Sequence, residues 1–122
     1  MSQMTVWKTF KFDAAHSLPH LPASPKCSKL HGHTYSVTVY VTGEMDKEKA
    51  WVIDYADIKK AFDPIFQRLD HNNVDCWINP STAENLAMFI WHELKPSLPG
   101  LSKLIVQETA DSGVEYIGDL HA

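Results

Sequence analysis

Two histidines separated by one glycine, His31-Gly32-His33, are the residues of this sequence whose spacing points most directly to chemistry. Side chains alternate along a strand, so residues two apart share a face about 6–7 Å from one another. Both imidazoles can then converge on one metal ion. His16 ends an earlier strand-like stretch on the parity of its apolar residues, as a third ligand should. Three histidines are typical of catalytic zinc, because a fourth position stays open for water or substrate.

Cys27 leaves the nature of this site open. Only Ser-Lys-Leu separates it from His31, which is short enough for its thiolate to become a fourth ligand. Four protein ligands would close the site, as in structural zinc centres. The same thiolate could instead transfer a proton in a catalytic site. A chain without metal, in which the histidines are partly exposed residues near a strand end, is a third interpretation.

Two further groups could take part in acid–base chemistry. Asp70 precedes His71, and a neighbouring carboxylate can orient an imidazole and raise its basicity. Alternatively, His71 only complements the dipole at a helix C-terminus. Glu108 follows Leu104 and Val106 on one strand face, where a buried carboxylate would need paired donors. Alternatively, Glu108 is solvated at a frayed strand end.

The strands that would hold these groups are predicted from alternation of apolar and polar residues. Residues 5–16 and 31–42 follow a period of two. Residues 101–109 and 113–117 predict a closing hairpin around Ala-Asp-Ser-Gly. We also expect residues 51–53 to extend the first hairpin.

Two helices are predicted between these hairpins. The first begins at an Asp54 N-cap and continues to Leu69, and Pro64 should kink or divide it near Asp63. The second begins near Ser81 or Thr82 and ends before Pro96. The predicted order is β-β-α-α-β-β, an α+β fold with two helices on one face of an antiparallel four-stranded sheet. The exposed edges of such a sheet are often closed by oligomerisation.

Length and composition narrow the class of protein. A chain of 122 residues suits a single domain over residues 1–122. A net charge of −4 argues against nucleic-acid binding, which usually leaves a basic footprint. No apolar run is long enough for a membrane span, and the first residues lack the layout of a signal peptide. We therefore expect a cytoplasmic protein in which Cys27 and Cys76 are free thiols.

Taken together, these motifs resemble the 6-pyruvoyltetrahydropterin synthase family from about residue 5 to residue 118. The motifs are His16, Cys27-x3-His31-Gly32-His33, Leu69-Asp70-His71, Pro80-Ser-Thr-Ala-Glu84 and Gln107-Glu108-Thr109. The spacing of three residues between Cys27 and His31 resembles that of the 6-carboxy-5,6,7,8-tetrahydropterin synthase type. The segment 79–84 is one residue longer than the usual Asn-Pro-Thr-x-Glu, which leaves open which hydroxyl caps the second helix.

The resemblance implies a fold, an assembly and a reaction. The family has the tunnelling fold, in which trimers close their sheets into a barrel and two trimers stack into a homo-hexamer with active sites between subunits. The implied substrate is 7,8-dihydroneopterin triphosphate. The implied products are 6-carboxy-5,6,7,8-tetrahydropterin, acetaldehyde and triphosphate, in the biosynthesis of 7-deazaguanines such as queuosine. The lysines that would hold the triphosphate are not identified.

The resemblance also implies a role for each site residue. His16, His31 and His33 would bind zinc, and Cys27 would remove a proton from the substrate side chain. His71, oriented by Asp70, would transfer a second proton. Glu108 would anchor the pterin and could join the proton relay, and Thr82 would also contact the substrate.

Three alternatives remain at this stage. A 6-pyruvoyltetrahydropterin synthase would have the same site but retain the substrate side chain. A non-catalytic zinc module would use Cys27 as its fourth ligand. A zinc hydrolase is disfavoured because the sequence has no acidic group within a metal-binding helix motif.

Overall fold

The computed structural model describes residues 2–20 and 28–119. Its elements confirm the predicted order β-β-α-α-β-β, with one added 3₁₀ turn. They are β1 (Gln3–His16), β2 (His31–Glu44), α2 (Tyr55–Leu69), η1 (Val74–Cys76), α3 (Ala83–Leu94), β3 (Leu101–Thr109) and β4 (Ser112–Tyr116).

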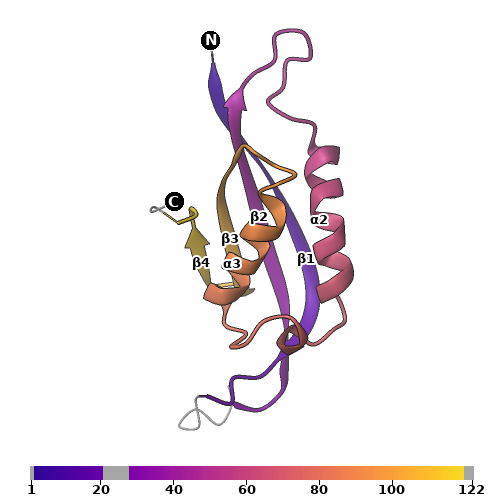
Figure 1. Cartoon of the computed structure of the whole chain (residues 1–122), viewed down its shortest axis with the longest axis vertical. Coiled ribbons are helices and arrows are strands. Elements are labelled where there is room, and N and C mark those ends of the chain that lie inside the picture. Colours follow the sequence, from indigo (N-terminus) through magenta and orange to yellow (C-terminus); the bar gives the residue numbers. More distant parts are fainter. Residues whose placement is uncertain (1, 21–27, 120–122) are drawn as a thin grey trace.

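The four strands form one antiparallel sheet in the order β1-β2-β3-β4. β1 and β2 pair along their whole length, from Gln3 opposite Glu44 to His16 opposite His31. Both helices lie over the same face of the sheet, and η1 lies at the end where β1 finishes (Figure 1). The end of β1 is therefore the place where strands, η1 and connecting loops meet.

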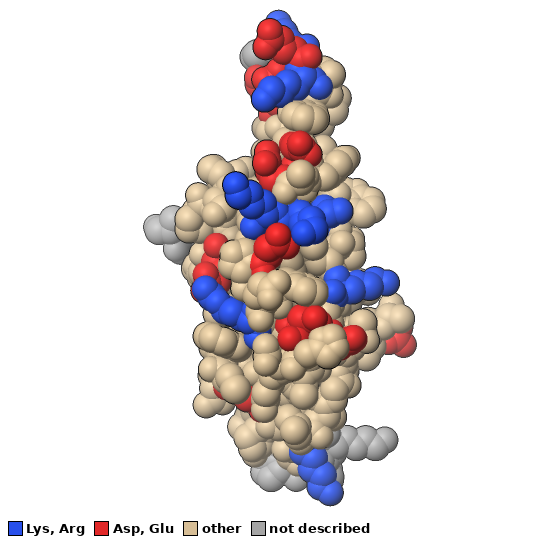
Figure 2. Space-filling model, turned by 90° about the vertical axis from the view of Figure 1, so that its right-hand side faces the viewer, with Lys and Arg blue, Asp and Glu red and all other residues tan. Residues whose placement is uncertain are grey.

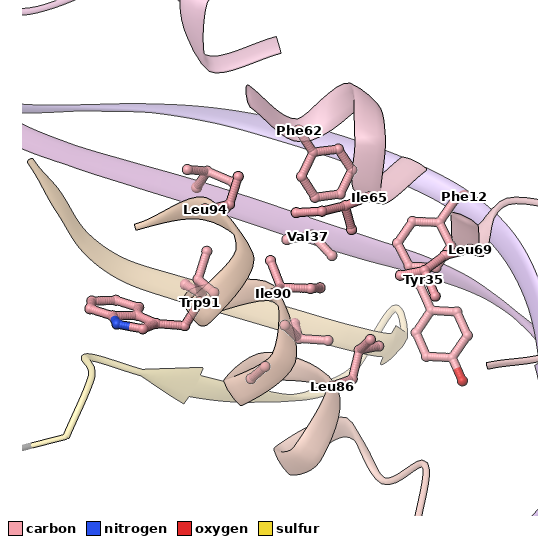
Figure 3. Packing of buried hydrophobic residues seen from close by; sticks show 14 of the residues in the cluster. Phe12, Tyr35, Val37, Phe62, Ile65, Leu69, Leu86, Ile90, Trp91 and Leu94 are labelled. Atoms are coloured by element: carbon pink, nitrogen blue, oxygen red, sulfur yellow. The ribbon is translucent and has the colours of Figure 1, made fainter. Parts of the chain in front are cut away.

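The core lies between the sheet and the two helices. Val37, Val39 and Leu104 are fully buried on the helix-covered face, as the period of two predicts. The helices contribute Phe62, Ile65, Leu86, Ile90 and Leu94 to the same cluster (Figure 3). Phe12 stacks on Tyr35 with ring centroids 5.2 Å apart. Tyr35 lies at the margin of the apolar side chains in Figure 3, with its hydroxyl pointing away from them.

The first helix begins as predicted but does not divide. Asp54 is the N-cap, and its side chain accepts a hydrogen bond from the Ala56 amide. α2 is continuous through Pro64, so the prediction of a division near Asp63 is wrong, and the alternative of a kink there stays a prediction. Buried residues on both sides of the proline hold the helix on the sheet, which outweighs one missing backbone hydrogen bond. They are Ile58, Phe62, Ile65 and Leu69.

The other elements follow the predictions, with one exception. Thr82 caps α3, which ends at Leu94 before Pro96. Residues 51–53 form bends and not an extension of the hairpin, so that prediction is wrong. The Asp46 amide and carbonyl bond to Trp51 and Ala50, which turns the chain back before a strand can continue.

The outer surface is mixed in charge. Figure 2 shows positive and negative side chains interspersed on the side that carries α2, without a large region of one sign. Among the described residues, no helix is both long and apolar enough to cross a membrane.

Candidate metal centre and active site

Three histidines meet at the end of the β1–β2 hairpin. His16 lies opposite His31 in the strand register, and His33 lies opposite Ala14. Their ring centroids are 4.5 to 5.0 Å apart. One nitrogen from each ring lies within 4.8 Å of the other two. The sequence prediction that these three residues share a face and converge is confirmed.

Two backbone carbonyl groups orient two of the rings. His16 Nδ1–H donates to the Ser81 carbonyl oxygen at 2.7 Å, and His31 Nδ1–H donates to the Lys29 carbonyl oxygen at 2.7 Å. A carbonyl oxygen can only accept, so the proton of each neutral ring is on Nδ1. Nε2 of both rings then carries the lone pair that a metal would need.

The third ring, His33, has its free nitrogen beside Glu108. His33 Nε2 lies 3.7 Å from Glu108 Oε2, too far for a hydrogen bond. Burial lowers the pKa of His33 below its ordinary value; the nearby Glu108 raises it, and His16 and His31 lower it further. The neutral imidazole that results is the form that binds metals.

Unpaired buried atoms indicate that this cluster is built for a ligand. Nε2 of His16 and Nε2 of His33 are buried and have no hydrogen-bond partner in the described part of the chain. Leaving such atoms unpaired costs free energy unless a bound group satisfies them. The three imidazoles therefore fit a metal ion, and a set of three histidines matches the open ligand set of catalytic zinc.

Asp70 and His71 form the predicted pair just beyond α2. His71 Nδ1 lies 2.9 Å from Asp70 Oδ2, and the other carboxylate oxygen accepts from the Asp13 amide at 3.1 Å. The hydrogen bond from His71 lowers the pKa of Asp70, and the same bond raises the pKa of His71. The second ring nitrogen, Nε2, is left as the atom that can exchange a proton.

An open hollow of about 680 Å³ is lined by one residue of the metal cluster and one residue of this pair. Both His33 and His71 line it. The remaining lining residues are Asp13, Ala14, Ala15, Gly32, Thr34, Asn72 and Asn73. A molecule in the hollow would touch a metal ligand and a proton-transfer group together, which is the arrangement that acid–base catalysis requires.

The other predicted site residues are placed as follows. Glu108 lies on the core-facing parity of β3 beside His33, and its side chain keeps 28% of its exposure. Thr82 Oγ1 accepts from the Asn85 amide at 3.2 Å, so Thr82 is the hydroxyl that caps α3. Cys27 lies outside the described residues.

The sequence prediction missed a polar cluster behind His16. Asp75, in η1, accepts hydrogen bonds from Ser17 and Ser81, and the carbonyl group of Ser81 holds His16. Burial raises the pKa of Asp75, but the bonds from the two serines outweigh it and lower the pKa overall. No local pattern reveals this cluster, because the residues that its hydrogen bonds join are 6 to 65 positions apart in the sequence.

Tyr35 was assigned only to the strand face, yet its hydroxyl belongs to the site region. The side chain is fully buried, and the hydroxyl has no partner among the described residues. Burial raises the pKa of Tyr35, and the charges of Glu108 and Asp75 raise it further, so the hydroxyl keeps its proton. Its position two residues after His33 on the same face was a signal that could have placed it there.

Known proteins are similar to this chain in sequence over most of its length. The profile of the family described as 6-pyruvoyl tetrahydropterin synthase matches residues 5–119. A dihydroneopterin monophosphate aldolase of Pyrococcus furiosus is 36% identical over 107 residues, covering 85% of this chain and 89% of the relative. A 6-carboxy-5,6,7,8-tetrahydropterin synthase of Synechocystis is 35% identical over 119 residues, covering 91% of each chain. A human 6-pyruvoyl tetrahydrobiopterin synthase is 36% identical over 135 residues, covering 96% and 93%.

Solved structures agree with this result. The structure of Caenorhabditis elegans 6-pyruvoyl tetrahydropterin synthase superposes with a TM-score of 0.88 at 29% identity, covering 98% of each chain. A 6-pyruvoyl tetrahydropterin synthase of Plasmodium vivax has a TM-score of 0.77 at 15% identity, covering 98% of this chain, and supports the fold alone. The tunnelling fold expected of the subunit is confirmed.

Proposed function

The chain belongs to the 6-pyruvoyl tetrahydropterin synthase family, and on this basis we propose that it is a zinc-dependent lyase acting on a dihydropterin triphosphate. The proposed reaction converts 7,8-dihydroneopterin triphosphate and water to 6-carboxy-5,6,7,8-tetrahydropterin, acetaldehyde and triphosphate, a step of 7-deazaguanine biosynthesis. The observation that carries the proposal is the convergence of His16, His31 and His33 beside a hollow that His71 also lines.

Each residue has a role that its surroundings support. His16, His31 and His33 would hold the zinc ion, which when bound supplies Lewis-acid polarisation of the substrate side-chain oxygens. His71 would give or take a proton at Nε2, because Asp70 engages its Nδ1.

The remaining roles concern the pterin and the first proton. Glu108 has room to accept hydrogen bonds from the guanidine-like edge of the pterin, since His33 Nε2, 3.7 Å away, is too far to donate one to it. The Cys27 thiolate would remove a proton from the substrate side chain. Thr82 uses its hydroxyl to cap α3, so its contact with substrate would be a second use of that side chain.

The relatives carry three different activities, so the product must be determined. We favour the carboxy product because three residues separate Cys27 from His31. The human relative, a 6-pyruvoyl tetrahydrobiopterin synthase, is 36% identical to this chain, and the Synechocystis 6-carboxy synthase is 35% identical. The pyruvoyl activity is therefore the main alternative. The Pyrococcus furiosus relative is a dihydroneopterin monophosphate aldolase, so an aldolase product is a third outcome that product analysis should look for.

Product analysis tests the proposal. The purified protein, loaded with zinc, is incubated with 7,8-dihydroneopterin triphosphate, and the products are identified by mass spectrometry. We expect 6-carboxytetrahydropterin and an equal amount of acetaldehyde. A pyruvoyl product without acetaldehyde would instead assign the rival synthase activity. No conversion of the triphosphate by zinc-loaded protein would refute the proposed reaction.

We also propose that the chain works as a homo-hexamer built from two trimers. Within the described sheet, β1 pairs with β2 and β4 with β3. The outer side of each edge strand therefore has no strand partner among the described residues, although Asp13 and Ala15 near the end of β1 bond to residues 71–73. Free edges favour pairing with another copy. Light scattering at micromolar concentration should give six times the 13.8 kDa chain mass, and a monomer mass would contradict it.

The compartment we propose is the cytoplasm. Cys76 is exposed and unpaired among the described residues, which suits a reducing environment.

A further inference from the structure

The polar cluster behind His16 centres on one carboxylate. Asp75 Oδ2 accepts from the Ser17 hydroxyl at 2.7 Å and from the Ser17 amide at 3.0 Å. Asp75 Oδ1 accepts from the Ser81 hydroxyl and, at 3.3 Å, from the Ser17 amide. Both oxygens of Asp75 are therefore engaged by donors.

The two serines that Asp75 binds are the two that control the position of His16. Ser17 follows His16 in the chain, so its amide and hydroxyl fix the backbone at the end of β1. Ser81 holds the His16 ring, with its carbonyl oxygen 2.7 Å and its hydroxyl 3.3 Å from Nδ1. The Asp75 carboxylate thus links Ser17, which follows His16 in the backbone, to Ser81, whose carbonyl group accepts the hydrogen bond from the His16 ring.

His16 depends on this arrangement more than His31 does. The His16 side chain is 1% exposed, so water has almost no access to it. His31 is more exposed, and its Nδ1 bonds to the carbonyl group of Lys29, only two residues away. The buried ligand is therefore the one that receives support from distant parts of the chain.

The Asp75 side chain is not needed to cap η1. Asn73 is the N-cap of η1, and its side chain accepts from the Asp75 amide at 2.9 Å. The Asp75 carboxylate is directed instead to Ser17 and Ser81. Its charge is held near the cluster of three imidazoles, where it would favour a bound cation.

We propose that Asp75 is a positioning residue for metal binding, which acts through Ser17 and Ser81 to hold Nε2 of His16 toward His31 and His33. This inference rests on the proposed function, because it assumes that the three histidines bind zinc. Partners behind a ligating histidine commonly change metal affinity 10- to 100-fold when they are substituted.

The test is the zinc affinity of Asp75→Asn, measured in the full-length protein by competition with a chromogenic chelator. We expect zinc affinity to fall by about 10- to 100-fold. The matched control is Asp46→Asn, which changes a carboxylate outside the metal cluster that is likewise held by hydrogen bonds, in its case from the backbone amides of Glu48 and Lys49. Its zinc affinity should stay within about twofold of the wild-type value.

A spectroscopic measurement separates positioning from general weakening of the fold. Cobalt replaces zinc, and its visible absorption reports ligand geometry. We expect the spectrum of Asp75→Asn to change and that of Asp46→Asn to match wild type. If Asp75→Asn does not fold, Ser81→Ala decides, because it keeps the carbonyl group but loses the hydroxyl link. Its zinc affinity should fall by about threefold or more.

The outcomes distinguish this inference from the proposed function. Zinc bound with wild-type affinity by Asp75→Asn, or by Ser81→Ala where that variant decides, overturns the positioning role and leaves the enzyme proposal intact. An unchanged cobalt spectrum in Asp75→Asn also overturns it. Wild-type protein that binds no zinc refutes the metal site of the proposed function itself.

Discussion

The two ends of the helix-covered sheet face differ in the side chains that they bury, which are apolar at one end and partly polar at the other. Over most of β2 and β3, the helix-covered face consists of apolar side chains such as Val37, Val39 and Leu104, all fully buried under α2 and α3. At the end of β1 and β2 the same face carries three buried polar atoms without a described partner, which are Nε2 of His16, Nε2 of His33 and the Tyr35 hydroxyl. The pairing of β1 with β2 runs without a register shift from one end to the other.

The difference shows that stability and chemistry are divided along the strands. The apolar end stabilises the fold by burying apolar surface, and the polar end destabilises it because buried polar atoms are left unpaired. Local rules are often broken at functional sites because the ligand that satisfies them is not part of the chain. The two ends should therefore respond independently to change.

Removing metal should affect only the polar end. Treatment with a chelator should lower turnover by on the order of 10³-fold or more, because Lewis-acid stabilisation supplies several kcal/mol. The far-UV circular dichroism should remain, since the core does not use the metal cluster. Restoring zinc should restore turnover. Unfolding on chelation would show that the two ends are not independent.

A core truncation should affect only the apolar end. Leu94→Ala removes a fully buried side chain from α3 and should cost about 2–5 kcal/mol in the free energy of unfolding. Urea denaturation measures this cost. Zinc content per folded chain should equal that of wild type, and a loss of zinc would argue against the division.

Tyr35→Phe tests the boundary between the two ends. The substitution removes a buried hydroxyl that has no described partner and keeps the ring stacked on Phe12. We expect the metal-free protein to gain about 1 kcal/mol in unfolding free energy. A loss of stability in urea denaturation would mean that the hydroxyl is satisfied.

The Asp70–His71 pair predicts a pH effect at the polar end. Asp70 raises the pKa of His71, so its contribution to stability is present below the ordinary histidine pKa of 6.5 and is lost as pH rises through the raised value. In Asp70→Asn the pKa of His71, followed by NMR of the ring, should fall toward 6.5. An unchanged pKa would show that the carboxylate does not act on this ring.

The sequence predicted best what lies within one strand or helix. The period of two placed His16, His31 and His33 on one face. Capping residues located the first helix start at Asp54 and the second to within one residue, at Ser81 or Thr82. These features depend on neighbours a few residues away, which a local pattern can record.

Features that depend on distant contacts were missed or mispredicted. Asp75 binds Ser17 across 58 residues, and nothing around either residue indicates the partner. α2 continues through Pro64 because its buried side chains pack on the sheet, which is a property of the tertiary structure. The metal ligands of the polar end could therefore be predicted from the sequence, but the groups that hold these ligands in place could not.

The most direct test of the account is the zinc content of three proteins, wild type, His31→Ala and Cys27→Ala. Three histidines supply a sufficient ligand set, so wild type and Cys27→Ala should each hold about one zinc per chain by elemental analysis. Turnover of Cys27→Ala should fall by on the order of 10²-fold while its zinc remains. His31→Ala should lose zinc and, with it, activity. Cys27→Ala as depleted of zinc as His31→Ala, or wild type without zinc, would contradict the account.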